Sequence, residues 1–488
     1  MGSTKLESEL LPQCWEQLGH KYSERRLLVA ESVAVLAPYT PSALRNSLLL
    51  SMLQQMLGPG GEREISVRDA AMISLALLIT YLDDSSKTSA LISTLIHCLE
   101  IHGWSADLSP FAVPKDSVST VPYPSIYYFY SSLALWSLEL KLLPEFLEPQ
   151  LTKLNQISME LNLEKQSAQK NQHSPTKNFH TNQVIFSLLS ALKAVCPFIL
   201  ALLIDSAPIT DEVPITTNTF LSSPDIANVI DELGLILGTK EKAKIGLCKI
   251  RQYMSKEWYK SWSELDYFTK TFLPSLVEPL CYIDPSSESL IQAYITLFLN
   301  LSLSLGHNVT SSHITPLFLS KLNADDGGID QIREGKSGLT SAILVVYTVA
   351  ILASREESIG NGELQDFLAR QTSILSLCGA PLDTLESCII NLLSRPNTEE
   401  SVLGALWSCV VHKSTSVRMV SASLWGLLIG QVEEGSLSNR VVPALVTLAT
   451  DPDEQVRAAS LSPLSSIIIT SSNKEVCIVQ LYFYQITK

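Results

Sequence analysis

A short pattern returns along this chain at intervals of about forty residues, and it constrains the fold more than any other feature. Near the end, "TSVRMVSASLWGLL" and "DPDEQVRAAS" place Arg418 and Arg457 39 residues apart. Near the start, "SERRLLVAESVAVLAP" and "ISVRDAAMISLALL" place Arg26 and Arg68 42 residues apart. A period near forty with helical apolar spacing is typical of repeats built from helix pairs. The pattern therefore predicts an array of such pairs.

A second pattern supplies the other helix of each pair. It has two apolar residues, a proline and then a helical apolar stripe, as in "ELLPQCWEQL", "KLLPEFLEPQ", "TFLPSLVEPL" and "RVVPALVTLA". We expect each of these helices to begin near its proline, because proline fits the first helical turn. The sequence thus predicts an all-α fold, a HEAT/armadillo-like α-solenoid (an ARM-type superhelix) of stacked antiparallel helix pairs. The concave surface of such a stack is the expected binding face.

The start of the last Val-Arg helix shows what each part of the pattern does. Asp451 is expected to cap free backbone N–H groups, and Pro452 fits the first helical position. Val456 is expected on the buried stripe, and the alanines after Arg457 are expected to let the helix approach its neighbours closely.

The arginine falls in the first helical turn, where its side chain can reach a carboxylate or a carbonyl of an adjacent repeat. We therefore interpret one set of residues as a structural ladder along the stack, not as a catalytic site: Arg26, Arg68, Arg418, Arg457, Asp451 and Pro452.

Changes in composition divide the chain into segments. Residues 8–142 are predicted to hold N-terminal HEAT-like repeats, and 143–225 to hold helices with polar loops at 162–183 and 205–225. The remaining predicted segments are helical repeats at 226–322, a Gly-rich polar loop at 323–338, C-terminal HEAT repeats at 339–470 and an atypical tail at 471–488. The tail contains "VCIVQLYFYQ", which has high β-propensity and no charge, so it fits a helical array poorly. Both ends of the array look cut.

Composition argues against several classes of partner. The formal net charge is −14, whereas nucleic-acid binders usually carry a basic stripe. No polybasic membrane patch is evident either. The nine cysteines are scattered and include no CxxC pair, which predicts reduced thiols in a cytosolic protein.

No segment predicts secretion or a membrane anchor. The first residues lack the apolar run of a signal peptide, and leucine stands at position 6 where a myristoylation motif needs Ser or Thr. "VIFSLLSALKAVCPFILALLI" (184–204) has the length of a membrane span, but Lys193 lies in its middle and Pro197 interrupts it. We interpret it as a buried helix pair, and we expect a soluble protein.

Candidate chemistry is weak throughout. "EGKS" (334–337) lacks the upstream glycine of a phosphate loop, and the acidic segment before it lacks the alternation of a calcium loop. "HCLEIH" (97–102) spaces its two histidines five apart, with no second Cys/His cluster to complete a metal site. "IYYFYSSLALW" (126–136) fits a packed helix, with an aromatic ligand box as the alternative. The sequence predicts no catalytic residue, no cofactor and no metal, and it assigns no partner-binding residue.

The sequences of the repeats resemble those of a known family. "LLPQCWEQLGHKYSERRLLVAES", "LAPY" and "LSMLQQML" near the start closely resemble the RELCH family of LisH, coiled-coil and HEAT-repeat proteins. "GALWSCVVHKSTSVR" and "RVVPALVTLATDPDEQVRAAS" near the end do so too. The correspondence runs from about Glu9 to Ile469 with a weak middle. The LisH and coiled-coil segments are absent here, and the tail replaces the repeats expected after Ile469, so self-association is doubtful.

The resemblance implies a cytoplasmic tether in membrane traffic. Its expected partners are a recycling-endosome Rab GTPase in the GTP state and an oxysterol-binding lipid-transfer protein. By bridging them, such a scaffold would promote cholesterol movement from recycling endosomes to the trans-Golgi network, with membrane association only through its partners. The alternative is a HEAT-repeat scaffold of other purpose, such as a phosphatase-type regulatory subunit or a transport receptor, whose acidic surface would suit basic cargo.

Overall fold

All regular elements in the described part of the chain are helices, which confirms the predicted all-α class. The structure, a computed structural model, describes residues 5–102, 125–168, 175–209, 224–255, 262–323, 328–354, 357–395 and 397–470. These residues fall into two compact units, which divide between Pro279 and Leu280. The boundary lies inside the segment 226–322 that the sequence treats as one block of repeats.

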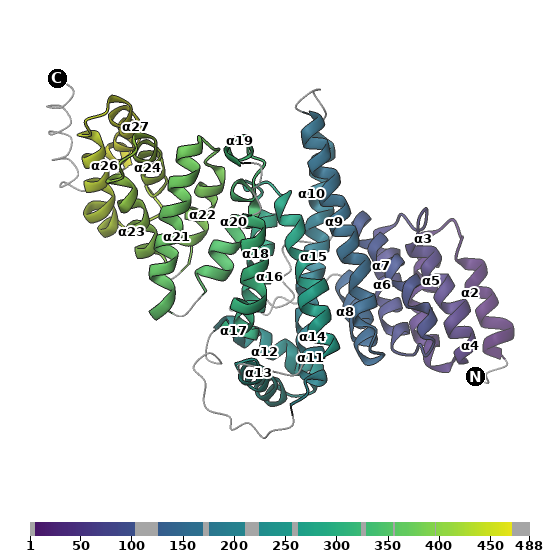
Figure 1. Ribbon diagram of the computed structural model, residues 1–488. Coiled ribbons are helices and arrows are strands. Elements are labelled where there is room, and N and C mark those ends of the chain that lie inside the picture. Colours follow the sequence, from purple (N-terminus) through teal and green to yellow (C-terminus); the bar gives the residue numbers. More distant parts are fainter. Residues whose placement is uncertain are drawn as a thin grey trace. The chain divides into compact units, whose positions relative to one another are not determined.

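The first unit opens with short helices and continues with longer ones (Figure 1). Its elements are η1 (Leu6–Leu10), α2 (Leu11–Gln17), α3 (Ser23–Leu36), η2 (Ala37–Tyr39), α4 (Ser42–Leu44), η3 (Arg45–Leu49), α5 (Leu50–Leu57), α6 (Ile65–Ile79), η4 (Ser85–Lys87), α7 (Thr88–His102), α8 (Ser125–Glu139), α9 (Leu143–Ala168), α10 (Pro175–Ala194), α11 (Cys196–Ser206), α12 (Pro224–Leu237), α13 (Lys240–Met254), α14 (Ser263–Tyr267), η6 (Phe268–Phe272) and α15 (Leu273–Val277).

The second unit follows a 3₁₀ turn, η7 (Glu278–Cys281), at the boundary. Its elements are α16 (Glu288–Leu305), α17 (His307–Val309), η8 (Thr310–Ile314), α18 (Thr315–Leu322), α19 (Gly328–Arg333), η9 (Gly338–Thr340), α20 (Ala342–Val346), η10 (Tyr347–Leu352), α21 (Glu357–Cys378), α22 (Asp383–Leu393), α23 (Glu399–Val410), α24 (Thr415–Leu427), α25 (Glu434–Ser436), η11 (Leu437–Val441), α26 (Val442–Ala449) and α27 (Glu454–Thr470).

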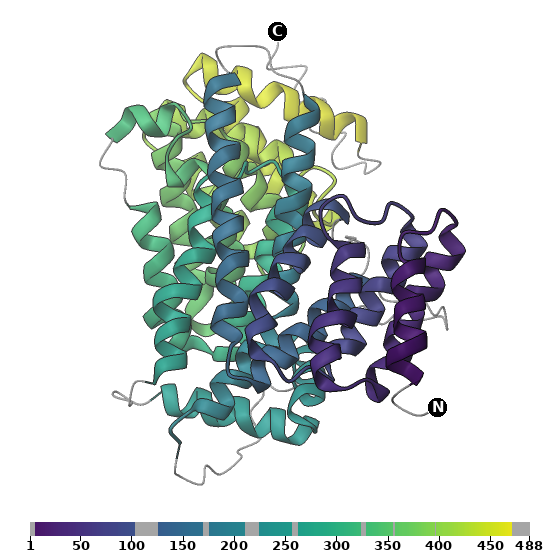
Figure 2. The same cartoon turned by 90° about the vertical axis from the view of Figure 1, so that its right-hand side faces the viewer.

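Each unit contains two parallel rows of helices, which is the arrangement of a solenoid. In the first unit α3 packs on α6 and α6 on α8, while α5 packs on α7 and α7 on α9. In the second unit α24 packs on α27 and α23 on α26, and each row also packs on the other. Figures 1 and 2 show α9 and α10 as long neighbours in the first unit, and these two helices are in contact. No single pair buries its own apolar face, so stacking supplies the core.

The expectation that each proline lies near a helix start is confirmed for Pro144, the second residue of α9, and is wrong for the other three segments. Pro12, Pro274 and Pro443 each follow a five-residue π-helical segment, η1, η6 and η11, that continues directly into α2, α15 and α26. Proline lacks an N–H and its ring clashes with the carbonyl four residues earlier. The wider π turn removes that clash, so the helix passes through the proline instead of beginning there.

The aromatic run at 126–136 lies within α8 and supplies most of its buried side chains, so the packed-helix interpretation is confirmed. Phe129 and Tyr130 are fully buried. The Tyr130 ring lies edge-on to Phe146 of α9, with ring centroids 5.3 Å apart, and its hydroxyl donates to Gln150 Oε1 at 3.2 Å. The second unit has its own aromatic core, in which Phe298 meets Phe318 edge-on at 5.0 Å.

Two predicted loops are partly helical. The loop expected at 162–183 lies within α9 as far as Ala168 and within α10 from Pro175. The segment "NLEKQSA" is rich in good helix formers, and proline at the start of α10 suits a first helical position. Within 323–338, residues Gly328–Arg333 form α19, with an acidic residue in its first turn and an arginine in its last. The loop expected at 205–225 lies largely outside the described residues, and so does the whole tail 471–488.

Within the described ranges, one helical stretch is long and apolar enough to cross a membrane by length and composition. It is His180–Ser206, and 78% of its most apolar window is buried inside the protein. Two bent helix pairs pass the same test if each is counted as one span, Glu288–Leu305 with His307–Leu322 and Ile329–Thr340 with Ala342–Leu352. A break at Val195 divides the first stretch into α10 and α11, as the sequence predicts for a buried helix pair.

Candidate functional site

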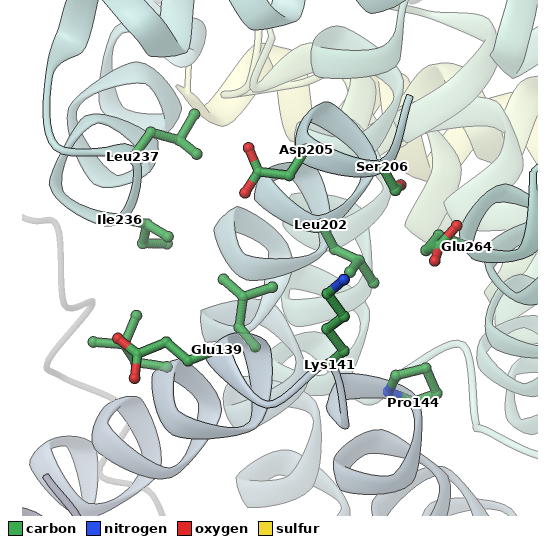
Figure 3. A pocket seen from close by; sticks show the side chains of 11 residues that line it. Glu139, Lys141, Pro144, Leu202, Asp205, Ser206, Ile236, Leu237 and Glu264 are labelled. Atoms are coloured by element: carbon green, nitrogen blue, oxygen red, sulfur yellow. The ribbon is translucent and has the colours of Figure 1, made fainter. Parts of the chain in front are cut away.

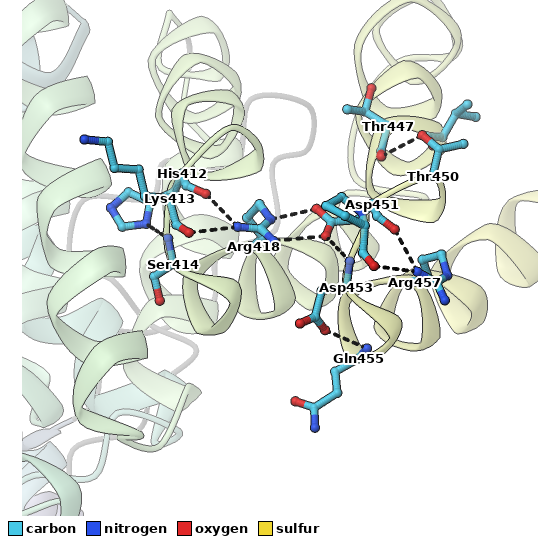
Figure 4. A network of polar contacts seen from close by, with 12 residues as sticks. His412, Lys413, Ser414, Arg418, Thr447, Thr450, Asp451, Asp453, Gln455 and Arg457 are labelled. Atoms are coloured by element: carbon cyan, nitrogen blue, oxygen red, sulfur yellow. Dashed lines mark hydrogen bonds and ion pairs between the residues drawn. The ribbon is translucent and has the colours of Figure 1, made fainter.

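The predicted ladder is clearest between the last two repeats, where Arg418 meets Asp451 (Figure 4). Arg418 is the fourth residue of α24, and Asp451 lies in the turn between α26 and α27. The guanidinium donates twice to the carboxylate, from Nε to Oδ2 at 2.6 Å and from Nη2 to Oδ1 at 3.0 Å. The side chains keep only 13% and 8% of their exposure. Such a bidentate pair fixes both distance and orientation between neighbouring repeats.

The same arginine also closes the turn before its own helix. Arg418 Nη1 donates to the carbonyl oxygens of His412 at 2.9 Å and Lys413 at 3.1 Å. In the next repeat Arg457, the fourth residue of α27, makes the equivalent bonds to Asp451 at 2.9 Å and Pro452 at 3.0 Å. Each arginine therefore has a local role that sequence spacing fixes, in its own turn. The carboxylate that pairs with Arg418, that of Asp451, belongs instead to the next repeat.

The N-terminal repeats contain the same arrangement. There Arg26, 392 positions before Arg418, takes the equivalent place. Arg26, the fourth residue of α3, donates from Nε and Nη2 to the two carboxylate oxygens of Glu62, the second bond measuring 3.0 Å. Its Nη1 donates to the His20 carbonyl at 2.7 Å. Arg68 of α6 donates to the Arg63 carbonyl at 3.3 Å. Each of the four predicted arginines is thus the fourth residue of its helix, and each donates to a backbone carbonyl of the turn before that helix.

Of the four residues that lie six positions before these arginines, sequence reasoning placed only Asp451 in the ladder and missed the other three. That position holds His20, Glu62, His412 and Asp451, and each side chain accepts a hydrogen bond from the backbone N–H two residues later, at 3.2, 3.0, 3.1 and 2.8 Å. The carboxylates of Glu62 and Asp451 also accept hydrogen bonds from the arginine of the preceding repeat. The shared spacing, "HKYSERR" beside "HKSTSVR" and "EREISVR" beside "DPDEQVR", was the signal that could have revealed it.

The predicted cap of the last helix is wrong by two residues. Helix α27 begins at Glu454, and Asp453 Oδ1 accepts the Gln455 N–H at 2.8 Å, so Asp453 is the cap. Pro452 lies before the helix. The carboxylate of Asp451 is held by Arg418 and by its own turn, which leaves it unable to cap. Val456 is fully buried as expected, whereas Ala458 is exposed and does not mediate close packing.

The ion pairs shift the ionisation of both partners. The hydrogen bond from Arg26 lowers the pKa of Glu62, and the hydrogen bond from Arg418 lowers the pKa of Asp451, in each case against the opposing effect of burial. The same bonds raise the pKa of both arginines. The Arg26–Glu62 and Arg418–Asp451 pairs each join two neighbouring repeats, whereas the hydrogen bonds of Arg68 and Arg457 named above stay within their own turns.

A hollow in the first unit is a better place for a partner (Figure 3). It has a volume of about 410 Å³, within the usual size range of ligand clefts. Its walls come from α8, the turn between α8 and α9, and helices α9, α11, α12 and α14. The lining residues are Leu135, Leu138, Glu139, Lys141, Pro144, Leu202, Asp205, Ser206, Ile236, Leu237 and Glu264. We call this hollow the acidic pocket.

The backbone is unusual where Lys141 enters the acidic pocket. Lys141 has φ of 60°, the left-handed conformation that glycine normally adopts after a helix. The turn closes with the Leu142 N–H donating to the Ser137 carbonyl at 2.7 Å. This geometry directs the Lys141 side chain into the hollow, towards Leu202 in Figure 3.

Other candidates from the sequence do not converge on a site. Lys336 pairs with Glu334 at 2.7 Å, and Ser337 Oγ accepts the Leu339 N–H at 3.1 Å, so the "EGKS" side chains serve their own turn. His97 is half-buried on α7, and the side chain of His102 lies outside the described residues. Over the described ranges no three His, Cys, Asp or Glu side chains gather into a group that could hold a metal ion. The eight cysteines of the described ranges are unbridged, and seven of them are buried.

A half-buried pair of opposite charges is a feature that the sequence only hinted at through Lys193. Lys193 of α10 and Glu232 of α12 influence each other in the interior of the first unit. Burial raises the pKa of Glu232 to about 8, against the opposing attraction of Lys193, and burial lowers the pKa of Lys193. We therefore expect this pair to affect how the stability of the first unit depends on pH.

Comparison with protein families gives two matches, one at each end of the chain. Residues 1–208 match the model described as "RAB11-binding protein RELCH N-terminal domain", and residues 340–484 match the "RAB11-binding protein RELCH C-terminal domain". The second match extends past Ile469 and includes most of the tail 471–488. The expectation that the resemblance ends at Ile469 is therefore wrong.

Similar curated proteins align with nearly the whole chain. The RAB11-binding protein RELCH homolog of Danio rerio is 32% identical over 97% of the chain and 38% of its own length. RAB11-binding protein RELCH of Mus musculus and of Homo sapiens is also 32% identical over 97% of the chain, and 37% of each protein is covered. The chain thus spans little more than a third of these relatives. An engineered protein of known structure aligns with 94% of the chain and 98% of its own length at 13% identity, but its TM-score of 0.23 is too low to bear on the fold.

Proposed function

Because the chain belongs to the RELCH family, we propose that it is a non-enzymatic scaffold that binds the Rab GTPase RAB11 in its GTP-bound state. The supporting observation is that both ends of the chain match domains of the RAB11-binding protein RELCH. A solenoid suits this role, since stacked repeats offer a long continuous surface to a protein partner.

The proposal extends to a second partner and to a place in the cell. We propose that the scaffold also binds an oxysterol-binding lipid-transfer protein, and that the bridge promotes cholesterol movement from recycling endosomes to the trans-Golgi network. Its location would be cytoplasmic, at the surface of these two compartments, with its partners providing the attachment. The internal fit of the ladder supports the scaffold role, because its charged groups are engaged in holding repeats together.

The deciding experiment is calorimetric titration of the purified chain with RAB11, loaded in parallel with a non-hydrolysable GTP analogue and with GDP. Saturable binding of the GTP form alone supports the proposal. Equal binding of both forms, or of neither by a sample shown to be helical, contradicts it. An unrelated Rab protein in its GTP form is the specificity control.

The lipid-transfer partner needs a separate measurement. The chain would be titrated with the purified oxysterol-binding protein, with and without saturating GTP-form RAB11. Simultaneous binding of both supports a bridge, whereas competition between them excludes bridging by a single copy of this chain.

A further inference from the structure

We propose that the acidic pocket is a docking site for a cationic amphipathic helix of a partner protein. Such a helix would place an aliphatic side chain on the apolar floor and set lysine or arginine side chains against the acidic rim. This inference is independent of RAB11 binding, because it rests on the pocket alone. Three features of the pocket carry it: its apolar floor, its charge and the way helices end around it.

The floor of the pocket is aliphatic and partly open to solvent. Leu135 and Leu138 of α8, Leu202 of α11 and Ile236 of α12 contribute apolar surface. Leu135 retains 39% exposure, and Leu235, the neighbour of Ile236 in the chain, retains 84%. Exposed apolar surface beside a hollow is characteristic of a binding site, since burying it against a partner removes it from water.

The rim carries more negative than positive charge. Glu139, Asp205 and Glu264 line the hollow, and Lys141 is the single cation among the lining residues. Within the described ranges, neither Glu139 nor Asp205 forms an ion pair, although the lysine lies in the same pocket. These carboxylates are therefore available to the cationic side chains of a partner.

The helix ends around the pocket reinforce this charge. Helices α8, α11 and α12 all finish at lining residues, Glu139, Ser206 and Leu237, and a helix C-terminus carries partial negative charge. Helices α9 and α14 begin nearby, but each has a carboxylate in its first turn, Glu145 and Glu264, that offsets its positive end. The surroundings thus favour a cation over an anion.

One polar atom in the wall lacks a partner. The Ser206 hydroxyl oxygen is buried and forms no hydrogen bond with any described residue. Ser206 stands beside Asp205 at the end of α11 and its oxygen is closed to solvent, so the group that a cationic side chain would meet at this position is the Asp205 carboxylate. An anionic or purely apolar partner could cover the leucines. It would leave the rim carboxylates next to a group of the same charge or of no charge.

The test uses the full chain and a fluorescein-labelled helical peptide of leucine and lysine, about 18 residues long so that it forms a helix of several turns. A peptide with glutamate in place of lysine is the charge control. Binding is followed by fluorescence anisotropy at low and at physiological salt, because attraction to an acidic rim weakens as salt rises.

Two matched triple variants separate the pocket from overall charge. The pocket variant is Glu139→Gln, Asp205→Asn and Glu264→Gln, and the control variant neutralises three exposed carboxylates elsewhere, Glu31→Gln, Glu433→Gln and Glu434→Gln. We expect the pocket variant to weaken binding of the lysine peptide at least about tenfold, and the control variant at most about threefold. Circular dichroism confirms that both variants remain helical.

Three results overturn the proposal. Equal weakening by both triple variants would show diffuse attraction to an acidic protein. Equal binding of the glutamate peptide would exclude recognition by charge. If the chain forms dimers in sedimentation experiments and the pocket variant is monomeric, the occupant is a second copy of this chain. RAB11 titration of the pocket variant keeps the two proposals apart, since we expect its binding to be unchanged.

Discussion

Glu62 of the first unit and Asp451 of the second hold equivalent places in their repeats. Each lies six residues before the arginine of its own repeat, accepts the backbone N–H two residues later, and receives both Nε and Nη2 of the arginine in the preceding repeat. One carboxylate thus shapes a turn and joins two repeats. This double use explains why an acidic residue stands there, and it makes the junctions between repeats testable.

The Arg418–Asp451 pair is expected to contribute substantially to stability. Replacing Arg418 by methionine leaves the Asp451 carboxylate largely buried without its partner, so we expect a loss of about 2–4 kcal/mol in the free energy of unfolding. Urea denaturation followed by circular dichroism measures it. The matched control is Arg440→Met, because Arg440 pairs with Glu400 at 3.0 Å on the exposed surface, where a pair contributes about 0–1 kcal/mol. Equal losses in the two variants would contradict a special role for the ladder.

The ladder also predicts how stability depends on pH. The pKa of Asp451 is lowered in the folded protein from its ordinary value of 3.8, so the pair stabilises the fold fully above that value. The contribution is lost as pH falls through the lower pKa of the folded state. We therefore expect Asp451→Asn to be less stable than the unmodified chain at pH 7, and the difference to shrink as pH falls below about 4. Denaturation at pH 7 and pH 3 checks this, and a constant difference would rule out the ion pair as its source.

Glu232 predicts a pH dependence of opposite sign. Its pKa is raised to about 8, so the folded state retains a proton that the unfolded chain loses above the ordinary value of 4.5. Stability therefore falls as pH rises between these values. Glutamine at position 232 does not ionise. We therefore expect the free energy of unfolding of Glu232→Gln, relative to that of the unmodified chain, to increase by at least about 1 kcal/mol from pH 5 to pH 9. Thermal denaturation at both values measures the gain. Exposed Glu31→Gln is the control, and we expect no such trend from it.

Lys141 offers a test of backbone strain. Glycine adopts φ of 60° without the penalty of a side chain, so we expect Lys141→Gly to stabilise the first unit by about 0.5–1 kcal/mol. Lys141→Ala removes the ammonium but keeps the Cβ, and it separates the backbone effect from any effect of charge. A gain in both variants would assign the cost to the lysine side chain. A gain in neither would indicate that the turn relaxes without strain.

Features that depend on local spacing can be predicted from the amino-acid sequence. The period of about forty residues, the pairing of helices and the fourth-position arginines all follow from patterns within one repeat. The bonds from Arg418 and Arg457 to carbonyls five and six residues earlier belong to the same class. These carbonyls lie in the turn just before each helix, so the short separation along the chain keeps them within reach of the arginine.

Contacts between groups far apart in the chain depend on how the repeats stack. Arg418 finds its carboxylate 33 residues away, and its partner is set by how one repeat stacks on the next. Local preference would start a helix at Pro12, Pro274 and Pro443. In the folded protein each helix begins earlier, with a π turn before the proline. The acidic pocket joins ends of five helices spread from Leu135 to Glu264. No local pattern encodes such a meeting, because the stacking that buries the apolar faces also fixes which helix ends lie side by side.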